Sequence, residues 1–266
     1  MKSLWLMYHD IYDREPRPGV PASATAYHVS RTTFDGHLRA IHASGLRVVT
    51  VGDFVADPAA AGDSVILTFD DGWIGGFEIA VPLLQERGWR ATFYVTRDFV
   101  ERDHFCKRAT LRAAYAAGME IGVHGVTHRM LSACSHSEVV AEFRECRDYL
   151  ESVLGRPVGH ASVPGGDLTP MVVDCAREAG LTSLSNSRPG LNHARSSRFD
   201  LRRLAVKSTT SALDIARYCA FRLGPERARW AMLQLPRAVL GMRQYSRLRR
   251  VILRERRADP TEVFEP

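Results

Sequence analysis

The sequence lacks the cysteine patterns of a disulfide-stabilised domain or a zinc ribbon. It has five cysteines, which is an odd number, and no two of them form a C-x-x-C pair. We therefore expect reduced thiols, buried as small apolar residues in a reducing compartment.

Long apolar segments are also missing. The first ten residues contain one lysine and one short apolar run, Leu4 to Tyr8, which His9 and Asp10 end. A secretory signal needs an apolar region of about 7–15 residues, and a membrane-spanning helix needs about 18 or more. The sequence alone therefore predicts a cytoplasmic protein.

Basic residues outnumber acidic residues in only one part of the chain. Residues 211–266 contain twelve arginines and six acidic residues, 12 − 6 = +6, which equals the net charge of the 266-residue chain and leaves 1–210 neutral. Apolar residues alternate with these arginines, so we predict a basic helical extension with solvated arginine faces. A second interpretation is peripheral attachment to an anionic membrane surface. We expect no nucleic-acid partner.

Short apolar runs alternate with helical patterns along residues 1–210. Strands are predicted at 4–8, 48–51, 65–69, 91–95, 119–123, 158–163, 181–185 and near 201–207, and helices at 31–45, 77–87, 110–117, 135–154 and 170–179. Such βα units build parallel sheets. Seven or eight of them, without a G-x-G-x-x-G motif, predict an α/β domain over 1–210 that is a distorted (β/α)7-8 barrel.

Two adjacent carboxylates and two imidazoles follow two of these strands. Asp70 and Asp71 end the motif T-F-D-D, which Gly72 follows, and His124 and His128 bound the motif H-G-V-T-H. Because the carboxyl ends of barrel strands meet on one face, we expect these side chains to converge there. Three ligands can hold one divalent cation and leave a coordination position open, as in catalytic metal sites.

Asp70 and Asp71 can ionise side by side only when a cation or a hydrogen-bond donor separates their charges. A metal bound to one carboxylate would leave the other free to accept a proton. The alternative, a solvated Asp-Gly turn, fits poorly with the buried strand before it. Two histidines and a carboxylate suit Zn²⁺, with Co²⁺, Mn²⁺ and Ni²⁺ left open, and they also suit the iron of a ferrous oxygenase.

Two more groups follow strand ends. His9 directly follows the first strand and precedes Asp10, and Pro164-Gly165-Gly166 follows the strand at 158–163. We expect both groups on the same face, where two glycines let the backbone approach a substrate. The alternative for His9 is a histidine buried in the core. The remaining histidines have no partner pattern and are expected to be structural or surface residues: 28, 37, 42, 104, 136, 160 and 193.

T-F-D-D-G, H-G-V-T-H and the P-G-G loop together resemble the motifs of polysaccharide deacetylases, the NodB-homology domains of carbohydrate esterase family 4. The resemblance covers roughly residues 1–207. It implies a distorted (β/α) barrel, a divalent metal and N-acetylated sugars as substrates. It also implies that Asp70 is the general base and that Asp71, His124 and His128 hold the metal.

The chain departs from this family in three places. The third motif usually begins with an arginine that orients the base; Ser162 stands there, and Arg202 or Arg203 is the candidate replacement. Gly125 stands where the family more often has Ser or Thr. The usual C-terminal strand ending in a histidine is missing. An N-terminal strand ending in His9 resembles instead the circularly permuted exopolysaccharide deacetylases, which implies that His9 is the general acid.

The same resemblance assigns substrate contacts. The backbone N–H of Gly165 is expected to help the metal to hold the oxyanion of the reacting carbonyl. Leu6 is expected to help form a small acetyl pocket, and Pro164 and Trp73 are expected to contact the sugar.

The leading hypothesis is a metal-dependent hydrolase that removes the acetyl group from an N-acetylated sugar in a polysaccharide, an oligosaccharide or a lipid-linked glycan during cell-surface glycan synthesis. The alternative is a non-catalytic saccharide-binding domain, which the missing motif arginine favours and the retained Asp and His residues oppose. A ferrous oxygenase would require a co-substrate, for which we find no arginine signature. A glycosidase needs two carboxylates about 5–10 Å apart across a bond, which adjacent aspartates fit less well.

Overall fold

The computed structural model describes residues 1–232. The helices predicted for the basic extension between residues 233 and 266 lie outside the described residues. Within the described part of the chain, no helix is long and apolar enough to cross a membrane.

A nine-stranded sheet forms the centre of the molecule, in the order β10-β1-β5-β6-β7-β8-β9, with β11 also pairing with β1 and β4 with β5. All its neighbouring strands are parallel except β10 and β1. The strands are β1 (Ser3–Tyr8), β4 (Arg47–Val48), β5 (Ser64–Phe69), β6 (Thr92–Val95), β7 (Glu120–Val123), β8 (His160–Ser162), β9 (Ser183–Ser185), β10 (Leu191–Asn192) and β11 (Leu204–Ala205). A separate two-stranded sheet joins β2 (Ile11–Tyr12) to β3 (Val29–Ser30).

The sheet curls into a half-barrel whose open side is bridged by one short segment, 201–205. Leu201 forms a parallel bridge with Ser185 at the end of β9, and Leu204 in β11 pairs with Leu6 of β1. The segment therefore lies between the two ends of the curled sheet. The expectation of a barrel-like α/β fold is confirmed, and this closing segment brings residues from late in the sequence to the barrel mouth.

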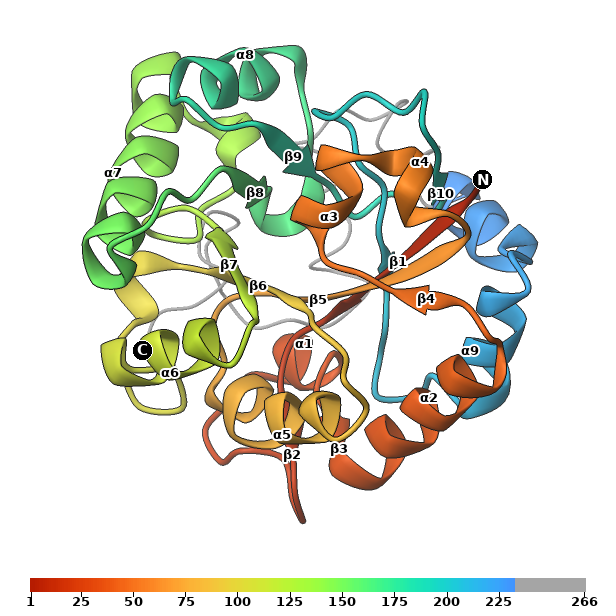
Figure 1. Ribbon diagram of the computed structural model, residues 1–266. Coiled ribbons are helices and arrows are strands. Elements are labelled where there is room, and N and C mark those ends of the chain that lie inside the picture. The colour runs from red at the N-terminus through yellow and green to blue at the C-terminus, as the bar shows by residue number, and fades with distance from the viewer. Residues whose placement is uncertain (233–266) are drawn as a thin grey trace.

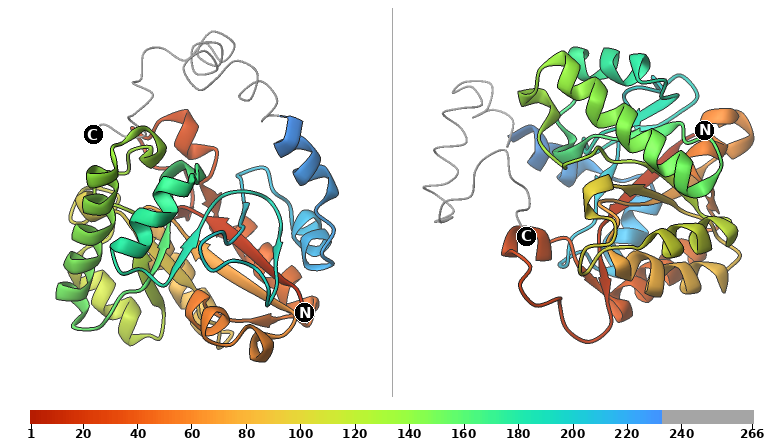
Figure 2. Two further views of the ribbon diagram at one scale, coloured as in Figure 1. Left: turned by 90° about the horizontal axis from the view of Figure 1, so that it is seen from above. Right: turned by 90° about the vertical axis from the view of Figure 1, so that its left-hand side faces the viewer.

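Helices pack on both sides of the sheet (Figures 1 and 2): most cover its outer side, and two short ones contribute Phe54 and Ala61 to the cluster of Trp5 on the other side. The helices are α1 (Ala22–Thr25), α2 (Arg31–Ala43), α3 (Val51–Ala56), α4 (Pro58–Ala61), α5 (Val81–Gln85), α6 (Arg108–Ala116), α7 (His136–Leu154), α8 (Pro170–Glu178) and α9 (Ala212–Cys219), with one π-helical segment, η1 (Gly76–Ala80), and the short 3₁₀ segments η2 (Arg97–Phe99), η3 (Leu131–Ala133) and η4 (Pro164–Gly166). The longest of them, α7, begins at the expected capping box of Ser135 and Glu138 and ends at Gly155, whose φ of 66° is left-handed.

Some sequence predictions of secondary structure were wrong. The strand expected at 48–51 is limited to Arg47–Val48, because Thr50 and Asp53 form a capping box that begins α3 at Val51. The single helix expected at 77–87 is divided into η1 and α5. The short helix α1 lies between the strand predicted at 4–8 and the helix predicted at 31–45, where no helix was predicted.

Side chains alternate between the two faces of the sheet, and this alternation decides which residues reach the barrel interior. Leu4, Leu6 and Tyr8 of β1 belong to the large core cluster shared with the outer helices. Trp5 belongs to a separate cluster with Ile66 of β5. Residues two positions further along a strand return to the same face. His9 is thus on the face of Trp5, and Asp70 on that of Ile66.

The core continues beyond residue 210, where the sequence suggested that the barrel domain ends. Ile215, Tyr218 and Cys219 of α9 and the following Leu223 are buried in the same cluster as the sheet. In Figure 1, α9 lies beside α2, and residues of the two helices are in contact. The first helix of the basic extension therefore belongs to the core of the barrel. The described chain ends in a helical stretch, 224–232.

Candidate metal and catalytic site

The two aspartates leave the end of β5 in a sharp turn. The backbone N–H of Asp70 donates to the carbonyl of Tyr8 at 2.9 Å, which continues the pairing of β5 with β1. Asp71 then has a φ of 71° and Gly72 a φ of 92°. A left-handed φ is unfavourable for aspartate and is typically retained at functional sites. The turn sends the two neighbouring carboxylates to different partners.

Asp71 lies against both histidines of the H-G-V-T-H motif. Its Oδ1 atom is 3.3 Å from Nε2 of His124 and 3.0 Å from Nε2 of His128. All three side chains are buried, and one ligand atom from each lies within 4.8 Å of the others. The structure therefore brings together the three residues that the sequence suggested as metal ligands.

The donor set fits a divalent cation. Oδ1 of Asp71 is buried without a hydrogen-bond partner, although it faces two imidazole nitrogens. A buried carboxylate oxygen without a donor is unfavourable, and a cation between the three groups would satisfy it. Burial raises the pKa of Asp71, but His128 and His124 lower it more, so that the net pKa lies well below its usual range. The ionised form, which binds metal, is thus the stable one.

Ser162 orients the first of the two histidines. Its hydroxyl is 2.5 Å and its backbone carbonyl 3.1 Å from Nδ1 of His124. A donor N–H at Nδ1 directed to the carbonyl leaves Nε2 unprotonated and directed to Asp71, the arrangement required of a metal ligand. The residue that stands in place of the motif arginine thus contacts a candidate ligand.

Trp73 fixes the other oxygen of Asp71. Its indole Nε1 donates to Oδ2 of Asp71 at 3.0 Å, and its ring contacts Phe105 and His28 at centroid distances of 4.3 and 4.6 Å. Only 2% of Trp73 is exposed. We expected this residue to bind the sugar; the structure places it beneath the site, as a support for a candidate ligand.

Arg203 supplies the guanidinium that the third motif lacks. Its Nη1 and Nη2 atoms donate to the two oxygens of Asp70 at 2.6 and 2.8 Å, and the whole side chain is buried. Burial raises the pKa of Asp70, but Arg203 and then His124 lower it more, so that the net pKa is below its usual value. Arg202, the other candidate, is exposed and lines a surface cavity instead.

His9 lies at the end of β1, on the interior face. Its Nδ1 is buried without a hydrogen-bond partner, and its ring stacks at a tilt on Tyr27 with 4.9 Å between centroids. Burial lowers the pKa of His9, while the charges of Asp71 and Asp70 raise it, and the net shift is downward. The charges that raise the pKa of His9 are thus those of the two motif aspartates. The role of His9 as general acid stays a prediction.

The P-G-G loop lies against the second metal motif. A Cβ atom at Gly125 would be 3.6 Å from Cγ of the buried Pro164. Gly165 is exposed with a φ of 65°, and a Cβ there would meet Sδ of Met130. Any larger residue at 165 would therefore be strained and would collide with Met130. This explains the glycine sterically and leaves its role in holding an oxyanion as a prediction.

Leu6 is fully buried in the large core cluster, on the side of β1 that faces the outer helices. This placement gives no support to a role in an acetyl pocket, which stays a prediction.

His28, which we expected to be structural or on the surface, is buried between Asp10 and Trp73, and neither of its ring nitrogens has a hydrogen-bond partner. No signal in the sequence marked its proximity to the site.

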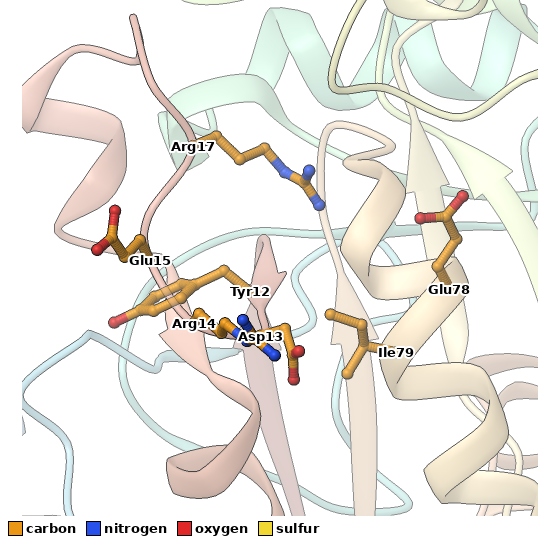
Figure 3. Close-up of a pocket in the computed structure, with 7 residues that line it drawn as sticks. All are labelled: Tyr12, Asp13, Arg14, Glu15, Arg17, Glu78 and Ile79. Atoms are coloured by element: carbon orange, nitrogen blue, oxygen red, sulfur yellow. The ribbon is translucent and has the colours of Figure 1, made fainter.

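A surface cavity of about 380 Å³ lies beside this region, between the chain after β1 and the helix that carries Glu78 (Figure 3). Its Arg17 donates through Nε to the buried carboxylate of Asp10 at 2.6 Å. Asp10 also accepts from the backbone N–H of Gly75 at 3.1 Å. One carboxylate thus connects the strand end that carries His9, the turn after Trp73 and the rim of the cavity.

The mouth of the curled sheet thus carries a carboxylate–imidazole cluster beside a second carboxylate that is bound by a guanidinium. Residues 57–184 match the family model "Polysaccharide deacetylase". These residues, which include both candidate metal motifs, therefore match a polysaccharide deacetylase domain of the NodB type. The motifs that suggested this family are confirmed; the circular permutation stays a prediction.

Several known proteins are similar to this chain. YxkH of Bacillus subtilis (strain 168) is 20% identical over 217 residues, 80% of this chain and 74% of that protein. The deacetylase PplD of Streptococcus pyogenes, solved in complex with acetate, has a TM-score of 0.71 at 21% identity, over 82% of this chain and 97% of that chain. IcaB from Ammonifex degensii has a TM-score of 0.71 at 22% identity, over 82% and 97%. These structures confirm the fold.

Proposed function

We propose that the protein is a metal-dependent hydrolase that removes the acetyl group from an N-acetylated sugar in a glycan. The observation that carries this proposal is the separation of two adjacent carboxylates. Asp71 faces two imidazoles, whereas Asp70 is held by Arg203 and lies 3.8 Å from Nε2 of His124. One carboxylate is thus available to a metal and the other to a proton.

Asp71, His124 and His128 would hold the metal. When bound, the cation would polarise the acetyl carbonyl and acidify a water molecule. Asp70 would accept the proton of the water that attacks the carbonyl carbon. Arg203 keeps this carboxylate ionised and fixes both of its oxygens, so that Asp70 meets the water in one orientation.

The remaining steps need an oxyanion donor and an acid. The backbone N–H of Gly165 would donate to the carbonyl oxygen as its negative charge develops; one such donor contributes roughly 3–4 kcal/mol. His9 would donate a proton to the amine that leaves when the C–N bond breaks. Acetate and the free amino sugar are the products.

The alternative of a non-catalytic saccharide-binding domain depended on the missing motif arginine. Arg203 removes that reason, because a buried guanidinium contacts both oxygens of Asp70. A binding domain would not require this pair, since an isolated buried ion pair contributes little net stability. Cytoplasmic location and contact with an anionic membrane stay predictions.

Acetate release from N-acetylglucosamine oligosaccharides tests the proposal. The purified protein would be supplied with Zn²⁺, and its metal content would be measured beside its activity. We expect Asp70→Asn to keep about one bound ion per chain and to lose about 10²–10⁴-fold in turnover. Asp174→Asn, which changes an aspartate with a 68% exposed side chain, is the matched control.

Undiminished turnover in Asp70→Asn would exclude Asp70 as the base. A wild-type protein that binds no metal and releases no acetate would exclude the proposed function, and the saccharide-binding alternative would replace it.

A further inference from the structure

One buried carboxylate outside the candidate site holds the loop between the two histidines. Glu142 lies on α7, and 5% of it is exposed. Its Oε2 atom accepts hydrogen bonds from the backbone N–H groups of Val126 at 2.6 Å and Thr127 at 3.0 Å. Its Oε1 accepts the hydroxyl of Thr127 at 2.5 Å. A single side chain thus binds three donors of one three-residue connection.

The other side of this loop is bonded as well. The carbonyl oxygens of Gly125 and Val126 accept from the backbone N–H groups of Arg97 and Asp98 at 3.1 and 3.0 Å. With Glu142 on the donors and this neighbouring segment on the acceptors, the loop is held from two directions. Its conformation is therefore decided by tertiary contacts, because no helix or strand contains it.

This loop ends in a residue that needs such support. His128 has a φ of 63°, in the left-handed region that a histidine seldom adopts. A conformation of this kind costs of order 1–3 kcal/mol and persists only where the surroundings enforce it. The backbone donor of Thr127, one residue earlier, is bonded to Glu142. The hydrogen bonds of Glu142 to Val126 and Thr127, called the clamp below, therefore fix the chain immediately before His128, the second histidine ligand candidate.

Gly125 is adapted to the same carboxylate. Its φ is 82°, and a Cβ atom there would lie 3.0 Å from Oε2 of Glu142, closer than side chains ordinarily approach. A serine or threonine at this position would thus be strained and would displace the carboxylate. The glycine at 125 and the glutamate at 142 are complementary features of this chain.

We infer that Glu142 is a positioning residue, which sets the metal affinity of the site by holding Val126 and Thr127 so that His128 faces Asp71. The inference rests on the proposed function, because it assumes that the three candidate ligands bind a metal. Outer-shell groups that orient metal ligands typically change affinity by about 10–100-fold when they are removed.

Two substitutions separate the geometry of the clamp from its charge. Glu142→Gln loses the charge, but its amide oxygen can still accept both backbone N–H groups while its NH₂ faces the threonine hydroxyl. Glu142→Asp keeps the charge on a side chain one methylene shorter, so that the carboxylate no longer reaches the loop. Glu145→Gln is the matched control, since Glu145 lies on the same helix and pairs through a 58% exposed side chain with Arg97.

Zn²⁺ affinity of the full-length protein would be measured by competition with a chromophoric chelator, and Co²⁺ coordination by its visible absorption. We expect Glu142→Asp to bind Zn²⁺ about 10–100-fold more weakly, with an altered Co²⁺ spectrum. Glu142→Gln and Glu145→Gln should stay close to wild type. If Glu142→Gln bound Zn²⁺ weakly and Glu142→Asp bound it like wild type, the charge of Glu142 and not its geometry would set the affinity, and the inference would be overturned. Equal affinities and spectra in all variants would also overturn it.

Amide hydrogen exchange in the metal-free protein tests the clamp without reference to the metal. The N–H groups of Val126 and Thr127 should be protected in wild type and Glu142→Gln, and exchange much faster in Glu142→Asp. Unchanged protection in Glu142→Asp would overturn the inference. Failure of the wild-type protein to bind Zn²⁺ or Co²⁺ would instead contradict the proposed function, and the role of Glu142 in metal affinity with it, even if the amides of the loop were protected.

Discussion

Arg203 and Asp70 form a fully buried, two-pronged ion pair across the barrel mouth, although they are 133 positions apart in sequence. Nη1 of Arg203 also donates to the hydroxyl of Thr68, and its Nε donates to the carbonyl of Asn186. The guanidinium lies 5.2 Å from the ring centroid of Tyr94. These contacts hold the guanidinium of Arg203 on several sides and fix the orientation in which it donates to Asp70.

Arg203→Lys should leave Asp70 poorly positioned, because an ammonium cannot bind both carboxylate oxygens in the planar arrangement of a guanidinium. We expect turnover to fall about 100-fold with little change in metal content. Loss of a bidentate buried contact should also lower the free energy of unfolding by about 3 kcal/mol. Acetate release and urea denaturation measure the two effects. Arg202→Lys, at the neighbouring exposed position, should behave as wild type, and equal activity of both variants would refute the assignment.

Trp73→Phe should weaken metal binding while it keeps an aromatic ring packed at this position. The phenyl ring keeps the contact with Phe105, but no donor remains for Oδ2 of Asp71. We expect about 10-fold weaker Zn²⁺ affinity, since outer-shell donors orient metal ligands, while KM for the sugar changes little. The control is Trp89→Phe, at a partly buried tryptophan whose ring is tilted against that of His42 at a centroid distance of 6.2 Å. A large rise in KM with normal metal affinity would support instead the direct sugar contact that the sequence suggested.

Ile215→Ala should destabilise the barrel, although residue 215 lies beyond the expected domain boundary. Ile215 is fully buried in the main cluster, and truncation of a buried isoleucine typically costs about 2–5 kcal/mol. Leu213, on the same helix, is 83% exposed, and Leu213→Ala should change stability by less than about 0.5 kcal/mol. Thermal and urea unfolding of both variants compare them directly. Similar small effects would mean that α9 contributes nothing to the core.

Stability should fall on acidification because of His28. Burial, the main cause, lowers the pKa of His28 from 6.5 to about 4. Between these pH values the unfolded chain binds a proton that the folded chain does not, so the free energy of unfolding decreases as the pH falls. The contribution is complete above pH 6.5, is lost by about pH 4, and amounts to at most about 3 kcal/mol.

Urea unfolding of the metal-free protein at about pH 7 and about pH 4.5 checks this prediction. The loss of stability between the two pH values should be smaller in His28→Gln than in wild type. In His193→Gln, which changes an exposed histidine, it should equal that of wild type. The same loss in all three proteins would mean that His28 does not titrate differently on folding.

Local sequence patterns predicted most of the elements that build the barrel. The apolar runs at 65–69 and 119–123 and the capping box at Ser135 reflect short-range preferences, and the structure confirms each of them within a residue or two. Prediction was wrong at 48–51, where the capping box of Thr50 and Asp53 outweighs the β-branched run. The sequence did not predict the two-residue strand β10 and placed β11 only roughly, near 201–207. Strands this short are defined by the strands with which they pair.

The sequence by itself determined the candidate ligands, because Asp71, His124 and His128 lie at the ends of parallel strands, which must meet on one face of such a sheet. It also limited the replacement for the missing arginine to two neighbours. Only the tertiary structure decided between them, since the closing segment buries Arg203 and exposes Arg202. The contacts of Glu142 and Trp73 were likewise decided by tertiary structure. Glu142 reaches its loop only because α7 packs against that loop, and Trp73 reaches Asp71 only because the chain turns sharply between them. No local preference encodes either arrangement.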